Sequence, residues 1–304
     1  MFPCRWRSGD FAPERGCVAD QPQHSDWRSA HSRAPENLKL DDTIPATVRF
    51  TAFRNRHYGV AVSGIVMAKQ IAEMVIESAV MELPDTKTIR LKWPEGYDID
   101  FKTGQFITLY WPDTPAYKRA YSLSSCALDR GFYEVTVKRD GKMGTRIVDW
   151  AKAGDKMFVI PPTGKFLPVY EPDKHLICVA GGSGVTPFRA FVREATRRKL
   201  GTKITVLYSV RTTNDIIFYE EFQKLQTENP RFSFYVTCTR LHPDDSWNGR
   251  RGRITPEWIR EQINDLDKTV FYACGPNELV DFAEHLVVAD LKVPKAQMKT
   301  EKWG

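Results

Sequence analysis

The sequence has 304 residues, which is long enough for two domains of ordinary size. Its composition, 42% hydrophobic and 27% charged, is typical of a globular protein, and a net charge of +6 without blocks of basic residues argues against nucleic-acid binding. No run approaches the roughly 18 apolar residues of a membrane span. The six cysteines lie far apart without zinc or iron–sulfur spacing, which predicts no metal site, reduced thiols and a cytoplasmic protein.

Residues 1–66 differ from the rest of the chain. They are rich in Arg, Ser, Pro and Asp and lack periodicity over the first forty positions, which predicts a leader that is disordered or not part of the fold. Met67 directly precedes the first strand-like pattern and would serve as a start, so we interpret the leader as an upstream extension of the reading frame. A transit peptide is the alternative, although four acids in the first thirty residues count against it.

Residues 67–168 carry short β-prone runs punctuated by Gly, Pro and Asp, the pattern of a small antiparallel barrel. The runs are 75–80, 88–91, 105–110, 120–124, 133–137 and 157–160. Between the last two, residues 144–153 have a helical pattern that places Thr145 as the N-cap.

Residues 169–304 alternate between strand and helix. Strands are expected at 176–180, 204–210, 232–238 and 270–273, with helices near 186–199, 217–227, 256–263 and 277–290. This alternation predicts a doubly wound α/β domain with a parallel sheet.

One barrel run has unusual chemistry. Residues 119–124 read RAYSLS, which places a cation, an aromatic ring and hydroxyls on one strand. A flavin lying across the strand end would let Arg119 pair with a pyrophosphate, Tyr121 stack on the isoalloxazine and Ser122 hydrogen-bond near N5. An ordinary barrel strand with a packed tyrosine is the alternative.

Two glycine-containing turns precede helices. Residues 141–145 (GKMGT) present free N–H groups that suit a phosphate, and residues 181–188 (GGSGVTPF) follow a buried strand, where glycines would let a dinucleotide approach. Thr186 is expected to cap the second helix, with Pro187 at its first position. Each turn also reads as an ordinary turn with a cap.

The last apolar strand ends in YACGPNE, residues 272–278, at the edge of the sheet where ligands of α/β proteins bind. Cys274 would pack beside a nicotinamide. A structural thiol followed by a Gly-Pro turn is the alternative.

In this order, the four segments resemble the ferredoxin–NAD(P) reductase family of FAD-dependent oxidoreductases, including the reductase components of bacterial oxygenases, over residues 67–304. The resemblance implies a FAD-binding barrel at 67–168 and an NAD(P)-binding domain at 169–304. It also implies hydride transfer from NAD(P)H to FAD, and then single electrons passed to a separate acceptor such as a ferredoxin or an oxygenase component. The pattern departs from some relatives in showing no iron–sulfur domain, which leaves the acceptor open.

The resemblance also implies roles for individual residues. The expected catalytic residues are Ser122, Cys274, Glu301 and Trp303, with Trp303 hypothesised as a gate over the flavin and a frayed terminal aromatic as its alternative. The expected FAD contacts are Arg119, Ala120, Tyr121, Ser122, Lys142, Met143, Gly144 and Thr145. The expected NAD(P) contacts are Gly182, Ser183, Gly184, Thr186, Arg211, Arg240, Cys274, Gly275 and Pro276.

Coenzyme choice depends on arginines. Arg211 and Arg240 follow the second and third strands of the predicted parallel sheet, where a 2′-phosphate would lie, and this favours NADPH. Features typical of NADH-using relatives are also present, so NAD stays open. A non-catalytic flavin-binding electron-transfer or regulatory subunit, or a reductase of free flavin or other small acceptors, also remains open.

Overall fold

The computed structural model describes residues 71–303, so the predicted leader over 1–66 lies outside the described residues. Within that range, no helix is both long and apolar enough to cross a membrane.

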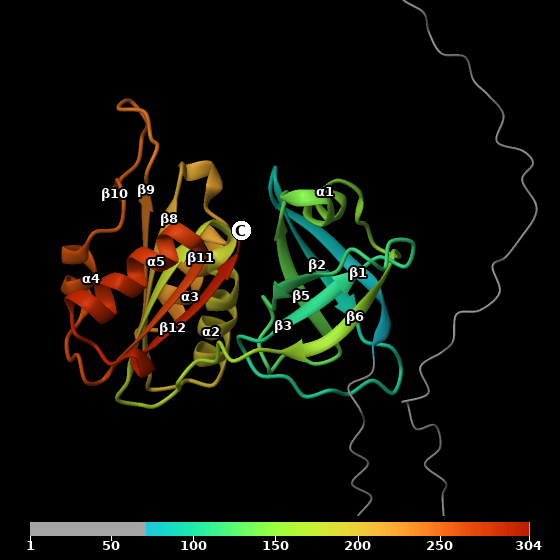
Figure 1. The fold of residues 1–304 in the computed structure, drawn as a ribbon, viewed down its shortest axis with the longest axis horizontal. Helices are drawn as coiled ribbons and strands as arrows, with labels where there is room; N and C mark the ends of the chain where they lie inside the picture. Colours follow the sequence, from blue (N-terminus) through green and yellow to red (C-terminus); the bar gives the residue numbers. More distant parts are fainter. Residues whose placement is uncertain (1–70, 304) are drawn as a thin grey trace, which may run out of the picture. The chain divides into compact units, whose positions relative to one another are not determined.

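The first half of the described chain forms an antiparallel sheet of six strands (Figure 1). Its order is β4-β3-β6-β1-β2-β5, and the two outer strands meet through a bridge between Leu123 and Val135 and a hydrogen bond from Ser124 N to Glu134 O, 2.9 Å. The sheet therefore closes into the predicted barrel. The bounds are β1 Ala72–Leu83, β2 Thr86–Lys92, β3 Phe106–Tyr110, β4 Arg119–Ser122, β5 Phe132–Lys138 and β6 Lys156–Thr163.

Alternate side chains of these strands fill the barrel. Ile76, Ile89, Leu91 and Val135 are fully buried in one cluster, which Met143 and Ile147 of helix α1 (Gly141–Trp150) close. Helix α1 begins three residues earlier than predicted. Asp140 is its N-cap, so the prediction of Thr145 as the cap is wrong. The capping residue was misjudged because Gly141, with φ +56°, already turns the chain into the helix.

The second half forms a parallel sheet of six strands in the order β10-β9-β8-β7-β11-β12. The strands are β7 His175–Gly181, β8 Lys203–Val210, β9 Phe232–Cys238, β10 Arg250–Arg251, β11 Thr269–Pro276 and β12 Met298–Trp303. The helices are α2 Thr186–Arg197, α3 Tyr219–Glu228, α4 Pro256–Gln262 and α5 Asn277–His285, the last continuing as a π-helical turn, Leu286–Asp290. This is the predicted doubly wound α/β fold.

The parallel sheet is buried on both faces. Cys178 and Ala180 of β7 face the core that α2 and α3 cover, whereas Ile177 and Val179 face the core of α4 and α5. Figure 1 shows α5 across one face of the sheet. The chain builds outward from β7 through β8, β9 and β10, then returns to β11 on the other side of β7. The gap between β7 and β11 is therefore the topological switch point, where ligands of such sheets bind.

Candidate functional site

The strand β7 ends at the switch point in a tight turn. A 3₁₀ turn, Gly182–Val185, links β7 to α2. Gly182 has φ +52° and no neighbouring atom within 4 Å of where a Cβ would stand, so its position is both left-handed and open. A Cβ on Gly184 would overlap the carbonyl oxygen of Cys274. Gly184 is thus required for packing against β11, and Gly182 leaves open space beside the backbone.

No side chain within residues 71–303 caps the start of α2. Val185 is the N-cap without a side-chain hydrogen bond, and Pro187 is the second helical residue. The predictions of Thr186 as the cap and Pro187 at the first position are therefore wrong. Thr186 instead donates its hydroxyl to Ser183 O at 2.7 Å, because the 3₁₀ turn brings that carbonyl within reach. The Thr186 N–H also donates to Ser183 O, so what this turn offers an anion is the open backbone at Gly182 and the positive end of the α2 dipole.

Three predicted catalytic residues meet at the end of β11. Cys274 lies opposite Glu301 in the β11–β12 register, with its Sγ 3.8 Å from Glu301 Oε2. Ser122 of the barrel strand β4 donates its hydroxyl to the same oxygen at 2.8 Å. Residues 122, 274 and 301 therefore form one cluster, although they are far apart in the sequence.

Burial sets the protonation of this cluster. It raises the pKa of the Glu301 carboxyl, which the hydrogen bonds from Ser122 and Cys274 lower only in part. The pKa of the Cys274 thiol is well above its usual range because the thiol is buried and lies beside Glu301. A neutral thiol and a carboxyl that readily holds a proton therefore stand at the switch point.

Gly275, Pro276 and Trp303 complete the end of this strand pair. Gly275 has φ +146° and lies against the backbone of Gly181, and exposed Pro276 pairs with Trp303 in the register. Trp303 is half-buried and packs against the core beneath α2 and α3.

The barrel side carries the RAYS segment on β4. Arg119 and Ala120 are exposed, and the only hydrogen bond of the Arg119 guanidinium within residues 71–303 is to Lys118 O, 2.9 Å. Tyr121 is half-buried against the barrel core, and burial raises its pKa. Within residues 71–303, this strand thus presents a cation without a carboxylate partner and a partly open aromatic ring.

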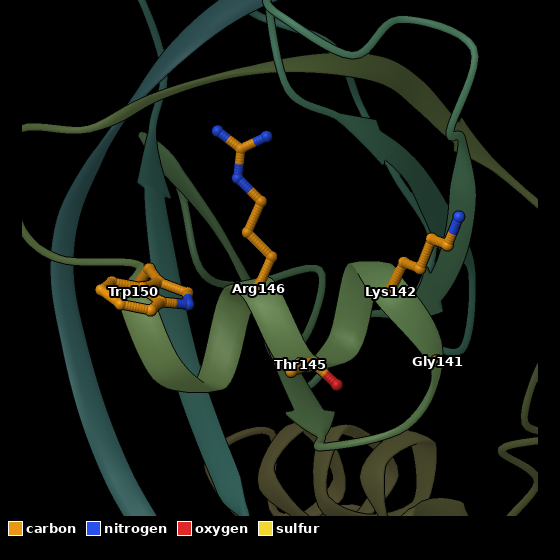
Figure 2. A pocket seen from close by; sticks show the side chains of 5 residues that line it. All are labelled: Gly141, Lys142, Thr145, Arg146 and Trp150. Carbon is orange, nitrogen blue, oxygen red and sulfur yellow. The ribbon is translucent and has the colours of Figure 1, made fainter. Parts of the chain in front are cut away.

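Helix α1 adds a hollow beside this strand. Figure 2 shows Lys142 and Arg146 projecting from one side of the helix and Thr145 from another, and the hollow is lined by Gly141, Lys142, Thr145, Arg146 and Trp150. Met143 and Gly144 are buried instead, and a Cβ on Gly144 would lie only 2.5 Å from Lys138 O. Lys142 Nζ lies 5.1 Å from the Tyr117 ring centroid and has no carboxylate partner in the described chain.

The site residues fit FAD. The start of α1 has no side-chain cap, so its first N–H groups suit a pyrophosphate, together with Lys142 and Arg119, which have no carboxylate partner within residues 71–303. Tyr121 offers a ring face, and Ser122 a hydroxyl, on the neighbouring strand. The sequence patterns did not point to Arg146, which pairs with Asp113 at 2.8 Å and stacks over Trp111, or to Trp150 beside it.

Arg211 and Arg240 lie at the carboxyl ends of neighbouring strands. Arg211 follows β8, Arg240 follows β9, and Arg240 N donates to Arg211 O at 2.8 Å. Neither side chain has an ion pair in the part of the chain that the structure describes. Asp215, the acid nearest to Arg211 along the chain, accepts hydrogen bonds from Thr212 N and the Thr212 hydroxyl at 2.9 and 2.8 Å.

Sequence reasoning missed an ionic cluster between the barrel and α2. Glu134 of β5 pairs with Arg189 and Arg193, and Asp129 with Arg197. The signal was present, because the three arginines recur every four residues and so share one face of the helix.

Comparison with known proteins supports this arrangement. The family model described as an oxidoreductase FAD-binding domain matches residues 73–167, and that of an oxidoreductase NAD-binding domain matches residues 178–285. A curated relative, one of the subunits of the Na(+)-translocating NADH-quinone reductase of Serratia proteamaculans, is 27% identical over 262 residues, covering 72% of this chain and 64% of that protein. The glycine betaine monooxygenase reductase subunit of Chromohalobacter salexigens is 30% identical over 180 residues, covering 58% and 49%.

Among solved structures, a ferredoxin NADP+ reductase from Neisseria gonorrhoeae with bound FAD and NADP has the same fold, with a TM-score of 0.64 and 24% identity over 77% of this chain and 99% of that one. The chain spans about half to two thirds of the length of the two curated relatives above. The FAD-binding and NAD-binding matches follow one another along the barrel and the parallel sheet. The chain therefore belongs to the ferredoxin–NAD(P) reductase family of FAD-dependent oxidoreductases.

Proposed function

We propose that this oxidoreductase transfers a hydride from NAD(P)H to FAD where Ser122, Cys274 and Glu301 meet, and then passes single electrons to a separate acceptor protein such as a ferredoxin or an oxygenase component. The observation that carries this proposal is the 2.8 Å hydrogen bond from Ser122 to Glu301, which joins the strand of the RAYS segment to the switch point of the parallel sheet. A flavin on the first and a nicotinamide on the second would face each other there.

The roles of the residues follow from their positions. Arg119, Lys142 and the start of α1 would hold the FAD pyrophosphate, and Tyr121 would pack on the isoalloxazine. Gly182 and the start of α2 would receive the coenzyme pyrophosphate, and Cys274 with Gly275 and Pro276 would border the nicotinamide. On this assignment residues 67–168 bind FAD and residues 169–304 bind NAD(P). Once bound, FAD accepts the hydride and releases electrons singly.

The chain's own groups orient and insulate the reacting atoms. The Ser122 hydroxyl is fixed by Glu301 and would direct its oxygen toward the flavin ring. Burial raises the pKa of Glu301 above its ordinary value, so this carboxyl would hold or release a proton beside the reacting atoms. Trp303, at the end of β12 beside Pro276, keeps its proposed role as a gate over the flavin.

The acceptor is proposed to be a separate polypeptide. The curated relatives are named as subunits, one of a NADH-quinone reductase and one of a monooxygenase reductase. Within residues 71–303 there is no cluster of His, Cys, Asp and Glu side chains that would hold a metal ion. Reduction of free flavin or other small acceptors, and a non-catalytic electron-transfer or regulatory role, are the outcomes that the assays below separate from this proposal.

The first experiment is an absorption spectrum of the purified full-length chain, followed by anaerobic mixing with NADH or NADPH. Rapid bleaching of bound flavin supports the enzyme, and bound flavin that does not bleach supports a non-catalytic module. A colourless protein that cannot be reconstituted with FAD would refute the proposal. Reduced enzyme is then offered ferredoxin, an oxygenase component or free flavin. Faster reoxidation by free flavin than by either protein contradicts the acceptor class.

We further propose a preference for NADPH. Two arginines without carboxylate partners in the described chain end neighbouring strands, and the nearby Asp215 is occupied by Thr212. Replacing Arg211 and Arg240 by Gln should lower kcat/KM for NADPH about tenfold or more and leave that for NADH within about threefold, because only the 2′-phosphate loses charge-assisted bonds. Comparable wild-type efficiencies with the two coenzymes would overturn the preference, and the names of NADH-using relatives make this comparison necessary.

A further inference from the structure

The contact between the barrel and α2 is made by charged groups that are largely buried. Glu134 of β5 is only 7% exposed, and its Oε2 accepts from Arg189 Nη1 at 3.2 Å and Arg193 Nη1 at 3.3 Å. Asp129, also 7% exposed, pairs with Arg197. We call Glu134, Asp129 and the three arginines of α2 the arginine clasp.

The clasp is anchored on both sides. On the barrel, Arg90 of β2 donates to the other oxygen of Glu134 at 2.9 Å, so the carboxylate cannot swing away from the strand. On the parallel sheet, Glu221 of α3 accepts from Arg189 at 2.7 Å, a bond that lies within that half of the chain. Arg189 also donates to Ser124 O at 3.3 Å. Neither carboxylate nor guanidinium is free to move independently of its own element.

The clasp joins the two halves of the proposed reaction site. Helix α2 starts directly after the turn at Gly182–Val185, and Arg189 lies in its first turn. The Ser124 carbonyl that Arg189 contacts lies two residues beyond Ser122, just past the end of β4. A shift of α2 along the barrel would therefore move the coenzyme turn relative to Ser122.

Such a shift matters because hydride transfer requires near-contact between donor and acceptor atoms, and a misplacement of about 1 Å can cost about 100-fold in rate. We infer that the arginine clasp is a positioning device, in which Glu134 sets the registry between the α2 turn and the barrel strand and so determines the rate of hydride transfer. This inference rests on the proposed function. Its residues touch neither coenzyme nor flavin in the proposed arrangement and act through α2.

The structure offers a matched pair of variants. Glu134→Gln removes the carboxylate that crosses between the halves, whereas Glu221→Gln removes a carboxylate that faces Arg189 and Arg193 from within the parallel-sheet half. Both changes remove one negative charge opposite the same two arginines. Only the first removes ion pairs that cross to the barrel, while the contacts of Asp129 and Ser124 O with α2 stay.

The test has two readouts on the full-length chain. Anaerobic stopped-flow mixing with saturating NADPH or NADH measures the rate constant of flavin reduction. Calorimetry measures whether the described halves unfold in one transition or two. Glu134→Gln should slow flavin reduction about 10- to 100-fold, with FAD retained and the dissociation constant of the coenzyme changed less than about threefold, and should split the unfolding transition. Glu221→Gln should do neither.

Wild-type rates and a single transition in Glu134→Gln would overturn the inference, as would equal slowing in both variants. If Glu134→Gln does not fold, Arg193→Gln replaces it, because Arg189 and Arg90 then still satisfy Glu134 while the crossing contacts of Arg193 to Glu134 and Asp129 are lost. That variant should slow reduction about 3- to 10-fold, and an unchanged rate rejects the clasp. If the wild-type flavin is not reduced at all, the proposed function fails, while the calorimetric comparison still decides whether Glu134 couples the halves.

Discussion

At the scale of single residues, the Ser122 hydroxyl links the proposed flavin site to the protonation state of Glu301. It donates to a carboxyl whose pKa burial has already raised. Because this hydrogen bond favours the ionised form, Ser122→Ala should raise the pKa of Glu301 further. If flavin reduction depends on the ionised carboxylate, its acidic limb should move to higher pH in the variant, with a rate about tenfold lower at neutral pH.

The measurement is the pH profile of anaerobic flavin reduction by the coenzyme. Ser124→Ala is the control, since the Ser124 hydroxyl contacts Thr136 at 3.2 Å and not Glu301. An acidic limb that stays in place in Ser122→Ala would show that Ser122 does not control this carboxyl.

His175 at the start of β7 predicts a pH-dependent stability. Its Nε2 lies 2.9 Å from the Thr205 hydroxyl, Nδ1 has no partner within residues 71–303, and burial, with a smaller contribution from Lys203, lowers its pKa to about 4. The unfolded chain, with a pKa of 6.5 at this residue, takes up the proton first as the pH falls. Stability is therefore full above 6.5 and is lost as the pH falls from 6.5 to 4.

The expected loss from His175 is about 2 kcal/mol in the free energy of unfolding between pH 7 and pH 5. Urea unfolding of the wild type and His175→Gln at both pH values isolates this contribution, because the other titrating groups are common to both chains. Equal losses in the two proteins would contradict the assignment.

The sequence patterns reached Ser122, Cys274 and Glu301 through motifs, but not the contacts between them. Their spacing of 152 and 27 positions carries no distance information, and only the closed barrel and the β11–β12 register bring them together. Glu134 was missed for a different reason. A single carboxylate on a strand reads as a solvent-facing charge until the arginines of another half cover it.

At the scale of elements, the strand–turn–helix at residues 175–197 contains glycines required for two different reasons: Gly184 for close packing and Gly182 for its left-handed backbone. Gly184 has no room for a Cβ because the backbone of Cys274 and Gly275 fills the space, and that backbone cannot rotate away. Gly182 has room, but its φ of +52° costs an L-residue about 1 kcal/mol. Gly184→Ala should therefore lower the free energy of unfolding by about 3 kcal/mol or more, and Gly182→Ala by about 1 kcal/mol.

Urea unfolding of the two variants compares them directly, and the ordering is the decisive result. Gly182→Ala should instead weaken coenzyme binding more than its small loss of stability suggests, since it fills the open space beside the turn. A Gly182 variant that is less stable than the Gly184 variant would show that packing against β11 does not explain the second glycine.

The periodicity of the sequence predicted the existence and type of these elements, but it did not predict the residues at which the helices begin. Buried strands such as β7 and the amphipathic α2 follow hydrophobic patterns that a single sequence carries. Helix starts depend on which residue turns the chain. In α1 the chain turns at Gly141, and before α2 it turns in the 3₁₀ turn, so the hydroxyls of Thr145 and Thr186 do not mark the helix starts.

At the scale of the whole described chain, a buried phenol of the parallel sheet bonds the link that follows the barrel at two backbone positions. Tyr272 of β11 is fully buried, its hydroxyl donates to Leu167 O at 3.0 Å, and it accepts from Val169 N at 3.0 Å. Its ring also meets Phe166 edge-on at 5.5 Å. No local pattern in the sequence predicts the path of this link, because its partner Tyr272 lies about a hundred residues later.

Tyr272→Phe keeps the ring contacts and removes only the hydroxyl. Leu167 O retains a donor in Lys299 Nζ at 2.9 Å, whereas Val169 N loses its acceptor, so the free energy of unfolding should fall by about 1–3 kcal/mol. Tyr235→Phe is the matched control, since Tyr235 is 43% exposed, and should change stability by less than about 0.5 kcal/mol. Equal stability of the two variants in urea would contradict this account. A larger fall in Tyr272→Phe, accompanied by faster proteolytic cleavage within residues 164–174, would show that the phenol holds the link in place as well as stabilising the fold.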